Sequence, residues 1–180
     1  GRFFARAFGT THDVVGLDAD AAVVDAARAG GLYREVHLGR ADQLPFDNAS
    51  FQTVFANCAV EHMDHLDDVL HEVGRVLRPG GRFIGMMYAR HSLVVLKLWV
   101  KHALLKGRPW RSWADLVAHH MESPGTKAYT VPELNALWSE FSSCETTQIL
   151  TPYDYNWFPG WMRRWFRDRW GFFIAVRARK

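Results

Sequence analysis

The stretch from Gly39 to Ile84 constrains the fold of this 180-residue chain more than any other part of it. It begins with a polar loop, continues through a nearly continuous apolar run over 51–57, becomes amphipathic from about residue 65, and ends in a second apolar run. Short apolar strands joined by an amphipathic helix are typical of a parallel sheet covered on both faces. The stretch therefore predicts an α/β fold in which loops at the carboxyl ends of the strands hold a ligand.

The rest of the chain continues this alternation of helices and strands. Asp20 is expected to cap a helix over 20–29, and Thr130-x-x-Glu133 is a capping box that opens a later helix. Asp64 is expected to cap the helix of the central stretch, and Pro79-Gly80-Gly81 is expected to end it. The predicted strands cover residues 14–18, 33–38, 51–57, 82–88, 143–150 and 172–179.

Composition narrows the classes of protein to consider. With 48% hydrophobic residues the chain can bury one sizeable core, so a single domain over 1–180 is expected. A net charge of +3 is too small to predict a nucleic-acid partner. Cys58 and Cys144 lack metal-like spacing and suit a reduced, cytoplasmic protein. Glu61, His62 and His65 could form a metal site, but no further matching ligand is evident, so no metal is expected. The apolar run over 92–105 is interrupted by charges and is shorter than the roughly 20 residues that span a membrane.

Several short motifs of the central stretch occur together in one known family. They are Leu44-Pro45-Phe46, Phe51 before the apolar run, Glu61-His62, and the run from Arg75 to Gly81. With these motifs the chain resembles the class I S-adenosylmethionine (SAM)-dependent methyltransferase family, in particular its methyltransferase type 11-like domain. The resemblance implies a Rossmann-like, doubly wound, mostly parallel sheet with strand order 3-2-1-4-5-7-6 and an antiparallel last strand. It also implies SAM as the cofactor.

In that family a Gly-rich turn joins the first strand to the first helix, and residues 2–8 look like the helix after this turn. Gly1 is therefore interpreted as the last glycine of the turn and as a cofactor-binding residue; the alternative is that Gly1 is only the start of the chain. On the first interpretation the first strand is missing, which leaves its two neighbours without a hydrogen-bonding partner. We expect such a chain to bind SAM poorly by itself.

Asp18 is the strongest single site prediction. It ends a predicted strand about 20 residues after Gly1, at the spacing of the ribose-binding acid in a nucleotide-binding βαβ unit. Its carboxylate is expected to accept both ribose hydroxyls, with Ala19 lining the same pocket. The alternative role of a helix N-cap is better filled by Asp20.

The resemblance suggests two further contacts with the cofactor. The adenine is expected beside Arg40-Ala41-Asp42, and because many relatives have Asp where this chain has Arg40, either Asp42 or the Ala41 backbone is expected to recognise the base. Asn57 and Cys58 end the strand over 51–57, where backbone carbonyls can bind the amino group of the methionine portion.

The acceptor side is less sharply defined by the sequence. His62 can act as a general base at neutral pH, but a structural, locally hydrogen-bonded histidine is the commoner case. Residues 91–128 depart from the sheet pattern and predict a helical insertion, which either shapes the acceptor pocket as a lid or simply covers the sheet. Tyr88, His91 and Tyr129 lie near this insertion and are candidate acceptor-site residues.

Three functions remain open from the sequence. The first is methyl transfer to a small-molecule or lipid-like acceptor. The second is a non-catalytic binding module, because Arg40 and Gln52 stand where relatives favour Asp. The third, a nicotinamide-dependent oxidoreductase, shares the βαβ start and the ribose-binding acid but has no support from the segment that joins the predicted strands over 51–57 and 82–88. The apolar insertion, with Trp and Arg residues gathered over 157–170, also suggests peripheral membrane contact, although amphipathic packing explains these residues as well.

Overall fold

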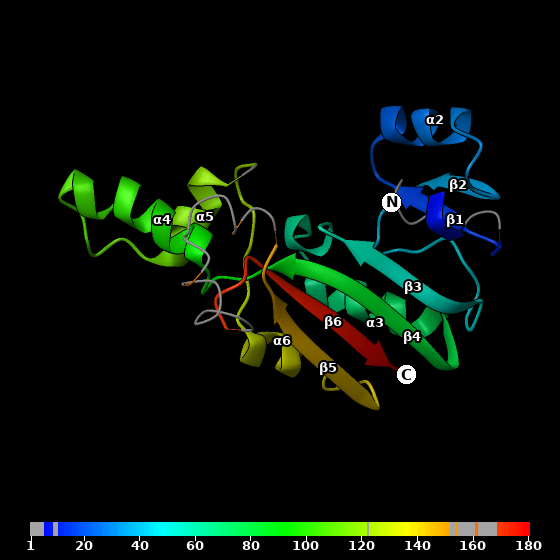
Figure 1. Ribbon diagram of the computed structural model, residues 1–180. Helices are drawn as coiled ribbons and strands as arrows, with labels where there is room; N and C mark the ends of the chain where they lie inside the picture. Colours follow the sequence, from blue (N-terminus) through cyan, green and yellow to red (C-terminus); the bar gives the residue numbers. More distant parts are fainter. Residues whose placement is uncertain (1–5, 9–10, 122, 152–153, 155–160, 162–168) are drawn as a thin grey trace. The chain divides into compact units, whose positions relative to one another are not determined.

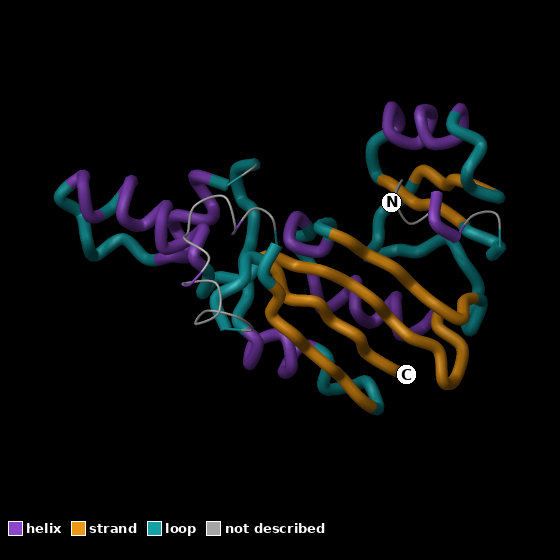
Figure 2. The backbone as a smooth tube through the Cα atoms, in the orientation of Figure 1, coloured by secondary structure: helices purple, strands orange, loops and turns teal. Residues whose placement is uncertain are grey.

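A computed structural model describes residues 6–8, 11–121, 123–151, 154, 161 and 169–180. Gly1, Trp157 and Trp165 lie outside these residues. The described helices and strands alternate as an α/β fold, as predicted (Figures 1 and 2). In chain order they are β1 (Val15–Asp18), α2 (Ala21–Ala29), β2 (Glu35–Leu38), β3 (Phe51–Asn57), the 3₁₀ helix η1 (Val60–His62), α3 (Leu66–Val76), β4 (Leu77–Tyr88), α4 (Leu93–His102), the 3₁₀ helix η2 (Leu104–Lys106), α5 (Trp113–His120), α6 (Val131–Leu137), β5 (Ser143–Ile149) and β6 (Phe173–Arg179).

The described strands form two sheets. In the first, β1 pairs in parallel with β2. The second has the order β3-β4-β6-β5, and β6 runs antiparallel to both β4 and β5. The antiparallel last strand is therefore confirmed. These two orders are the ones that the resemblance implies for family strands 2 and 3 and for family strands 4, 5, 7 and 6.

The chain divides into two compact units. The first comprises residues 1–54 and 65–81, and the second comprises residues 55–64 and 82–180. The division passes through β3 and β4, so each of these strands contributes to both units. A single domain over 1–180 stays a prediction.

In the first unit, side chains at the ends of α2 fix this helix beside the two-stranded sheet. Asp20 is the N-cap, as predicted, and its Oδ1 accepts a hydrogen bond from the backbone N–H of Ala22 at 2.8 Å. At the other end, Arg28 donates to the carbonyl of Val36 on β2 at 2.8 Å. The helix thus begins and ends at contacts that set the position of the β1–α2 turn, where Asp18 lies.

The start of α3 near His65 is confirmed, but its predicted cap and its predicted end were wrong. Its N-cap is His65 and makes no side-chain cap bond, whereas the carbonyl of Asp64 accepts a hydrogen bond from Lys127. The helix ends at Val76, and Pro79-Gly80-Gly81 lies inside β4. The physical reason is that a proline disfavours helical geometry at the residue before it, so the chain leaves the helix ahead of Pro79.

The second unit carries an aromatic core beneath the helical insertion. Its buried members come from β4, α4, α5, β6 and the connections before α6 and β6, and they are Tyr88, Val95, Val117, Ala128, Phe172 and Phe173. The prediction that helices follow the strand now labelled β4 is confirmed by α4, η2 and α5 (Figure 1). The capping box of α6 is also confirmed, with Thr130 and Glu133 each bonded to the backbone of the other. No helix of the described residues has the length and apolar character needed to cross a membrane.

Candidate functional site

The parallel pairing of β1 with β2 brings two predicted cofactor segments to one edge. Asp18 lies opposite Leu38 at the carboxyl ends of the two strands, and the backbone N–H of Gly39 donates to the carbonyl of Asp18 at 2.9 Å. The loop that begins at Arg40 therefore leaves the sheet beside Asp18, and the exposed Ala19 follows on the same edge. This is the edge at which parallel sheets bind their ligands.

The Asp18 carboxylate has capacity for a ligand. Its Oδ1 accepts one hydrogen bond, from the backbone N–H of Asp20 at 3.0 Å, and its Oδ2 accepts none from a described residue. The side chain is half-buried, so it is oriented without being enclosed. A carboxylate held by one oxygen and open at the other fits the ribose of SAM, whose hydroxyls need acceptors. The N-cap of α2 is Asp20 and not Asp18, as the sequence predicts.

The loop after β2 is closed by an ion pair between neighbouring residues. Arg40 donates from Nε and Nη2 to the two carboxylate oxygens of Asp42, at 2.9 and 2.6 Å. This hydrogen bonding holds the pKa of Asp42 below its usual range. Because both oxygens of Asp42 already accept bonds from Arg40, the backbone of Ala41 is the more available of the two predicted adenine contacts.

A clamp that sequence reasoning missed fixes the Leu44-Pro45-Phe46 motif. Arg75 of α3 uses all five of its N–H donors: Nη1 bonds the carbonyl of Phe46 and the side chain of Asn48, Nη2 bonds the carbonyl of Leu44, and Nε and Nη2 bond Glu72. Glu72 also accepts from the backbone N–H of Leu44 at 2.7 Å. The Arg75 hydrogen bond lowers the pKa of Glu72. Two motifs of the family resemblance, Leu44-Pro45-Phe46 and the run that begins at Arg75, are thus joined by hydrogen bonds.

In the second unit, Asn57 and Cys58 stand where β3 ends. Asn57 is exposed, and the backbone N–H of Cys58 donates to the carbonyl of Met86 on β4 at 2.9 Å. Cys58 has a φ of 49°, in the left-handed region that side chains other than glycine seldom adopt. The chain therefore turns sharply at Cys58, and its backbone carbonyls change direction where the resemblance places the methionine portion of SAM.

His62 is an exposed residue at the end of η1. Its Nδ1 lies 3.4 Å from Oγ of Ser123, which also lies 3.1 Å from Oγ1 of Thr126. This contact is long for a hydrogen bond, so the ring is only loosely held. Glu61 beside it is fully buried, and among the described residues no group of three or more His, Cys, Asp or Glu side chains is placed to hold a metal.

The three predicted acceptor-site residues have unlike surroundings. The backbone brings Tyr88 and Tyr129 together, with the N–H of Tyr129 donating to the carbonyl of Tyr88 at 2.9 Å. The Tyr88 ring is buried against Phe172 and Phe173, at centroid distances of 4.8 and 5.3 Å. Its ring therefore serves as core.

The other two candidates are more accessible than Tyr88. His91 is exposed, and its ring packs edge-on against that of Trp113 at a centroid distance of 5.5 Å. The backbone carbonyl of His91 accepts a hydrogen bond from the side-chain amide of Gln148. Burial, with the charges of Glu61 and Glu133, raises the pKa of Tyr129 to about 12. Tyr129 is therefore a neutral phenol at physiological pH and can donate a hydrogen bond but cannot act as a base there.

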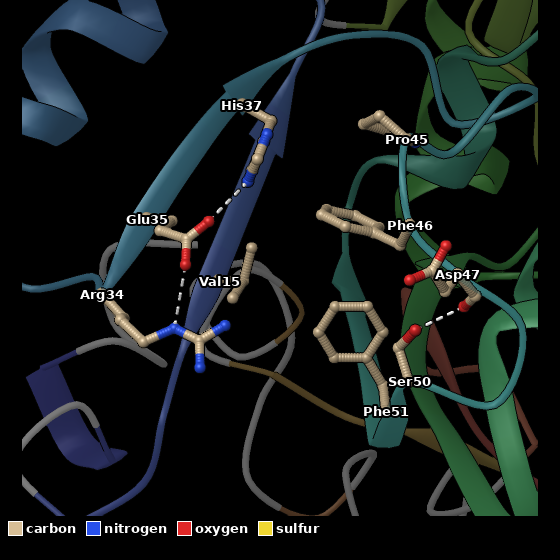
Figure 3. Close-up of a pocket in the computed structure, with 9 residues that line it drawn as sticks. All are labelled: Val15, Arg34, Glu35, His37, Pro45, Phe46, Asp47, Ser50 and Phe51. Atoms are coloured by element: carbon tan, nitrogen blue, oxygen red, sulfur yellow. Dashed lines mark hydrogen bonds and ion pairs between the residues drawn. The ribbon is translucent and has the colours of Figure 1, made fainter.

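A separate hollow of about 300 Å³ lies within the first unit (Figure 3). One wall carries Glu35, which bonds Arg34 at 3.2 Å and His37 at 3.1 Å, and the facing wall carries the rings of Phe46 and Phe51, 4.9 Å apart. The hollow lies near Val15, at the amino end of β1, and none of the predicted site residues lines it. It is therefore distinct from the edge that carries Asp18.

The sequence of the chain matches known methyltransferases over part of its length. Residues 1–85 match the family model of the methyltransferase domain. Ubiquinone/menaquinone biosynthesis C-methyltransferase UbiE of Brucella anthropi is 34% identical over 88 residues, which cover 46% of this chain and 34% of that protein. The mitochondrial 2-methoxy-6-polyprenyl-1,4-benzoquinol methylase of Mus musculus is 40% identical over 53 residues, covering 29% of this chain and 16% of that protein. The chain thus spans about a third or less of the length of these relatives.

Solved methyltransferase structures share the fold of the chain. A SAM-dependent methyltransferase of Thermotoga maritima, a possible histamine N-methyltransferase, superposes with a TM-score of 0.66 at 20% identity, covering 92% of this chain and 72% of that one. The 1,6-didemethyltoxoflavin-N1-methyltransferase of Burkholderia thailandensis, solved with S-adenosylhomocysteine, gives a TM-score of 0.59 at 17% identity, covering 100% and 66%. Residues 1–85 thus match the methyltransferase domain family, and the chain shares the fold of solved SAM-dependent methyltransferases.

Proposed function

We propose that this chain takes part in SAM-dependent methyl transfer to a small-molecule or lipid-like acceptor. The observation that carries the proposal is the Asp18 carboxylate, which ends β1 with one oxygen held by Asp20 and the other open to a ligand. The match of the first 85 residues to a methyltransferase domain gives this carboxylate its expected partner, the ribose of SAM.

The residues of the chain would mainly bind and orient. SAM supplies a methyl group on a sulfonium, which needs alignment and exclusion of water more than acid or base chemistry. Asp18 accepts the ribose hydroxyls beside Ala19, the Ala41 backbone recognises the adenine, and backbone carbonyls at Asn57 and Cys58 accept from the amino group. Gly1 belongs to the same binding set by the family resemblance.

On the acceptor side, His62 is the exposed residue that takes a proton where the acceptor is a hydroxyl or phenol. Tyr129 donates a hydrogen bond to the acceptor, and His91 contributes to the same surface, while Tyr88 supports it from the core. The polyprenyl group in the printed name of the mouse relative supports a lipid-like acceptor.

The test is calorimetric titration of SAM into the chain and into longer versions of the protein that include it. In a version that binds SAM, Asp18→Asn should weaken binding roughly 10- to 100-fold, because charge-assisted hydrogen bonds to the ribose are lost. Asp25→Asn, on the exposed face of α2, is the matched control and should leave affinity unchanged.

The proposal fails if no version binds SAM, or if Asp18→Asn binds as tightly as the parent. A second candidate function, a non-catalytic binding module, is favoured by the Arg40–Asp42 ion pair. Many relatives have an Asp where this chain has Arg40, whereas here the nearby Asp42 is neutralised by that Arg40. Tight SAM binding without methyl transfer to any member of a broad acceptor panel would support this second function over the first.

A further inference from the structure

The connection between α4 and α5 exposes large apolar side chains. Residues 104–110, here named the hairpin tip, are all exposed. Within the tip, Leu104 is 46% exposed, Leu105 75% and Trp110 77%. Exposed side chains of this size in one short segment are unusual in a soluble domain and commonly mark a site of interaction.

The tip is an ordered turn with its apolar side chains directed outward. Gly107 has a φ of 66° and donates to the carbonyl of Leu104 at 3.0 Å. The N–H of Arg108 donates to the carbonyl of the buried Ala103 at 2.8 Å, and the indole N–H of Trp99 donates to the carbonyl of Pro109 at 3.3 Å. These bonds hold the backbone of the turn in place, and the side chains of Leu104, Leu105 and Trp110 are exposed on it.

The base of the same hairpin is anchored in the core. Val95 of α4 and Val117 of α5 are both buried in the aromatic cluster that includes Tyr88. The hairpin therefore has a fixed, buried end and an exposed apolar end, which is the distribution of a surface element that supports a binding tip.

The charges around the tip have one sign. Lys101, Lys106 and Arg108 form no ion pair with any residue that the structure describes. Arg111 nearby is neutralised by Asp115 of α5, at 2.6 Å. No Asp or Glu occurs in the sequence from residue 90 to residue 114, so the tip is a cationic and apolar surface.

We propose that the hairpin tip docks on the surface of an anionic lipid bilayer. Trp and Leu side chains enter the boundary between head groups and acyl chains, while flanking Lys and Arg side chains contact anionic head groups. A single-sign cationic rim fits such a surface better than a folded protein, whose surface carries charges of both signs. The proposal does not depend on methyl transfer, but docking there would bring the chain to a lipid-like acceptor.

The test is flotation of the full chain with phosphatidylcholine vesicles, with and without phosphatidylserine. We expect recovery with the anionic vesicles only, and weaker binding at high salt because the charges are screened. Leu105→Asp and Lys106→Glu should each reduce binding about tenfold. Both variants add a negative charge that the anionic head groups repel, and Leu105→Asp also loses the burial of an apolar side chain. Quenching of Trp fluorescence by brominated lipid should fall in Trp110→Phe, a conservative variant that retains apolar character.

Matched controls separate docking from general effects of charge or folding. Val23→Asp places the same charge on an exposed apolar position of α2, and Lys180→Glu reverses one charge far along the sequence from the tip. Both should float like the parent, and circular dichroism checks that every variant is folded. Flotation equal to the parent in Leu105→Asp and Lys106→Glu would overturn the proposal. Failure of the parent to float with anionic vesicles would also overturn it. A change in oligomeric state in sedimentation as the only effect of Leu105→Asp would overturn it too, and would assign the tip to contact between copies of the chain.

Discussion

The ionisation of Tyr129 differs clearly from that of a solvated side chain. Burial is the main cause, and the carboxylates of Glu61 and Glu133 add to it, so the pKa of Tyr129 rises to about 12. In the unfolded chain the same phenol titrates near pH 10. Between these two values the folded state keeps a proton that the unfolded state has lost.

This difference sets the sign of a pH effect. The free energy of unfolding should fall as pH rises from about 10 to 12, because the unfolded state binds fewer protons there, and the loss from this one group is at most about 2–3 kcal/mol. Tyr129→Phe should decline less steeply over the same range, as measured by urea unfolding at a series of pH values. Equal slopes for parent and variant would contradict the raised pKa.

Asp18 and Asp20 show how two similar side chains, two positions apart, take different roles. Asp20 caps α2 through Ala22, and Asp18 is oriented by the Asp20 backbone with one oxygen open to a ligand. The predicted loss of SAM affinity in Asp18→Asn therefore belongs to this one carboxylate, whereas Asp20 contributes mainly to the stability of the helix.

Among the elements, the loop over 44–48 depends on α3 for its conformation. Arg75 and Glu72 together satisfy two carbonyls and one N–H of this loop, at 2.7 to 2.9 Å. Lysine cannot reproduce this planar five-donor pattern. Arg75→Lys should therefore loosen the loop, and chymotryptic cleavage after Phe46 should become faster, on the order of tenfold, because cleavage follows local opening.

The control for the loop is Arg78→Lys, which removes a guanidinium that donates to the carbonyl of Ala49 at 3.2 Å and to no other described residue. This variant should be cleaved at the parent rate. Low pH should loosen the loop in the same way as the Arg75 substitution. The pKa of Glu72 is lower in the folded state than its ordinary value of 4.5. The ionised Glu72 carboxylate therefore stabilises the loop above pH 4.5, and this stabilisation is lost as the pH falls further. Unchanged cleavage in Arg75→Lys would show that the loop is held by other contacts.

The capping box of α6 makes a second prediction at this scale. Thr130 accepts from the N–H of Glu133, and Glu133 accepts from the N–H of Thr130 at 2.8 Å. Thr130→Ala should lower the free energy of unfolding by about 1 kcal/mol, because a terminal N–H of the helix loses its partner. Thr130→Ser keeps the hydroxyl and should retain most of the stability in the same urea titration. A Ser variant as unstable as the Ala variant would instead implicate the Thr130 methyl group.

At the scale of the whole molecule, the two units share β3 and β4, because the division between them passes through both strands. Neither unit can unfold without disturbing these strands, so we expect one cooperative transition, as the predicted single domain requires.

The eight Trp residues all lie at position 99 or later, within the second unit. Trp fluorescence therefore reports on that unit, whereas far-ultraviolet circular dichroism reports on both. Coincident urea transitions by the two probes would support one domain, and a separate earlier transition by circular dichroism would contradict it.

The sequence by itself determined the features that rest on local chemistry. Periodicity and caps gave the α/β alternation, the Asp20 cap and the Thr130–Glu133 box, since helix caps and strand patterns involve residues only a few positions apart. The position of Asp18 at the end of a strand follows from the same local pattern. The end of α3 was predicted too late because the constraint at Pro79 acts on the residues before it.

Only the tertiary structure decided which distant groups meet. Arg75 bonds carbonyls 29 and 31 positions away, and a motif cannot show that these groups share one clamp. Likewise, the sequence grouped Tyr88 with Tyr129, but packing buries the first ring among phenylalanines and leaves the second as a half-buried phenol with a raised pKa. The physical reason is that burial and hydrogen bonding depend on the side chains that other elements bring near, and these are set by strand pairing and packing along the whole chain.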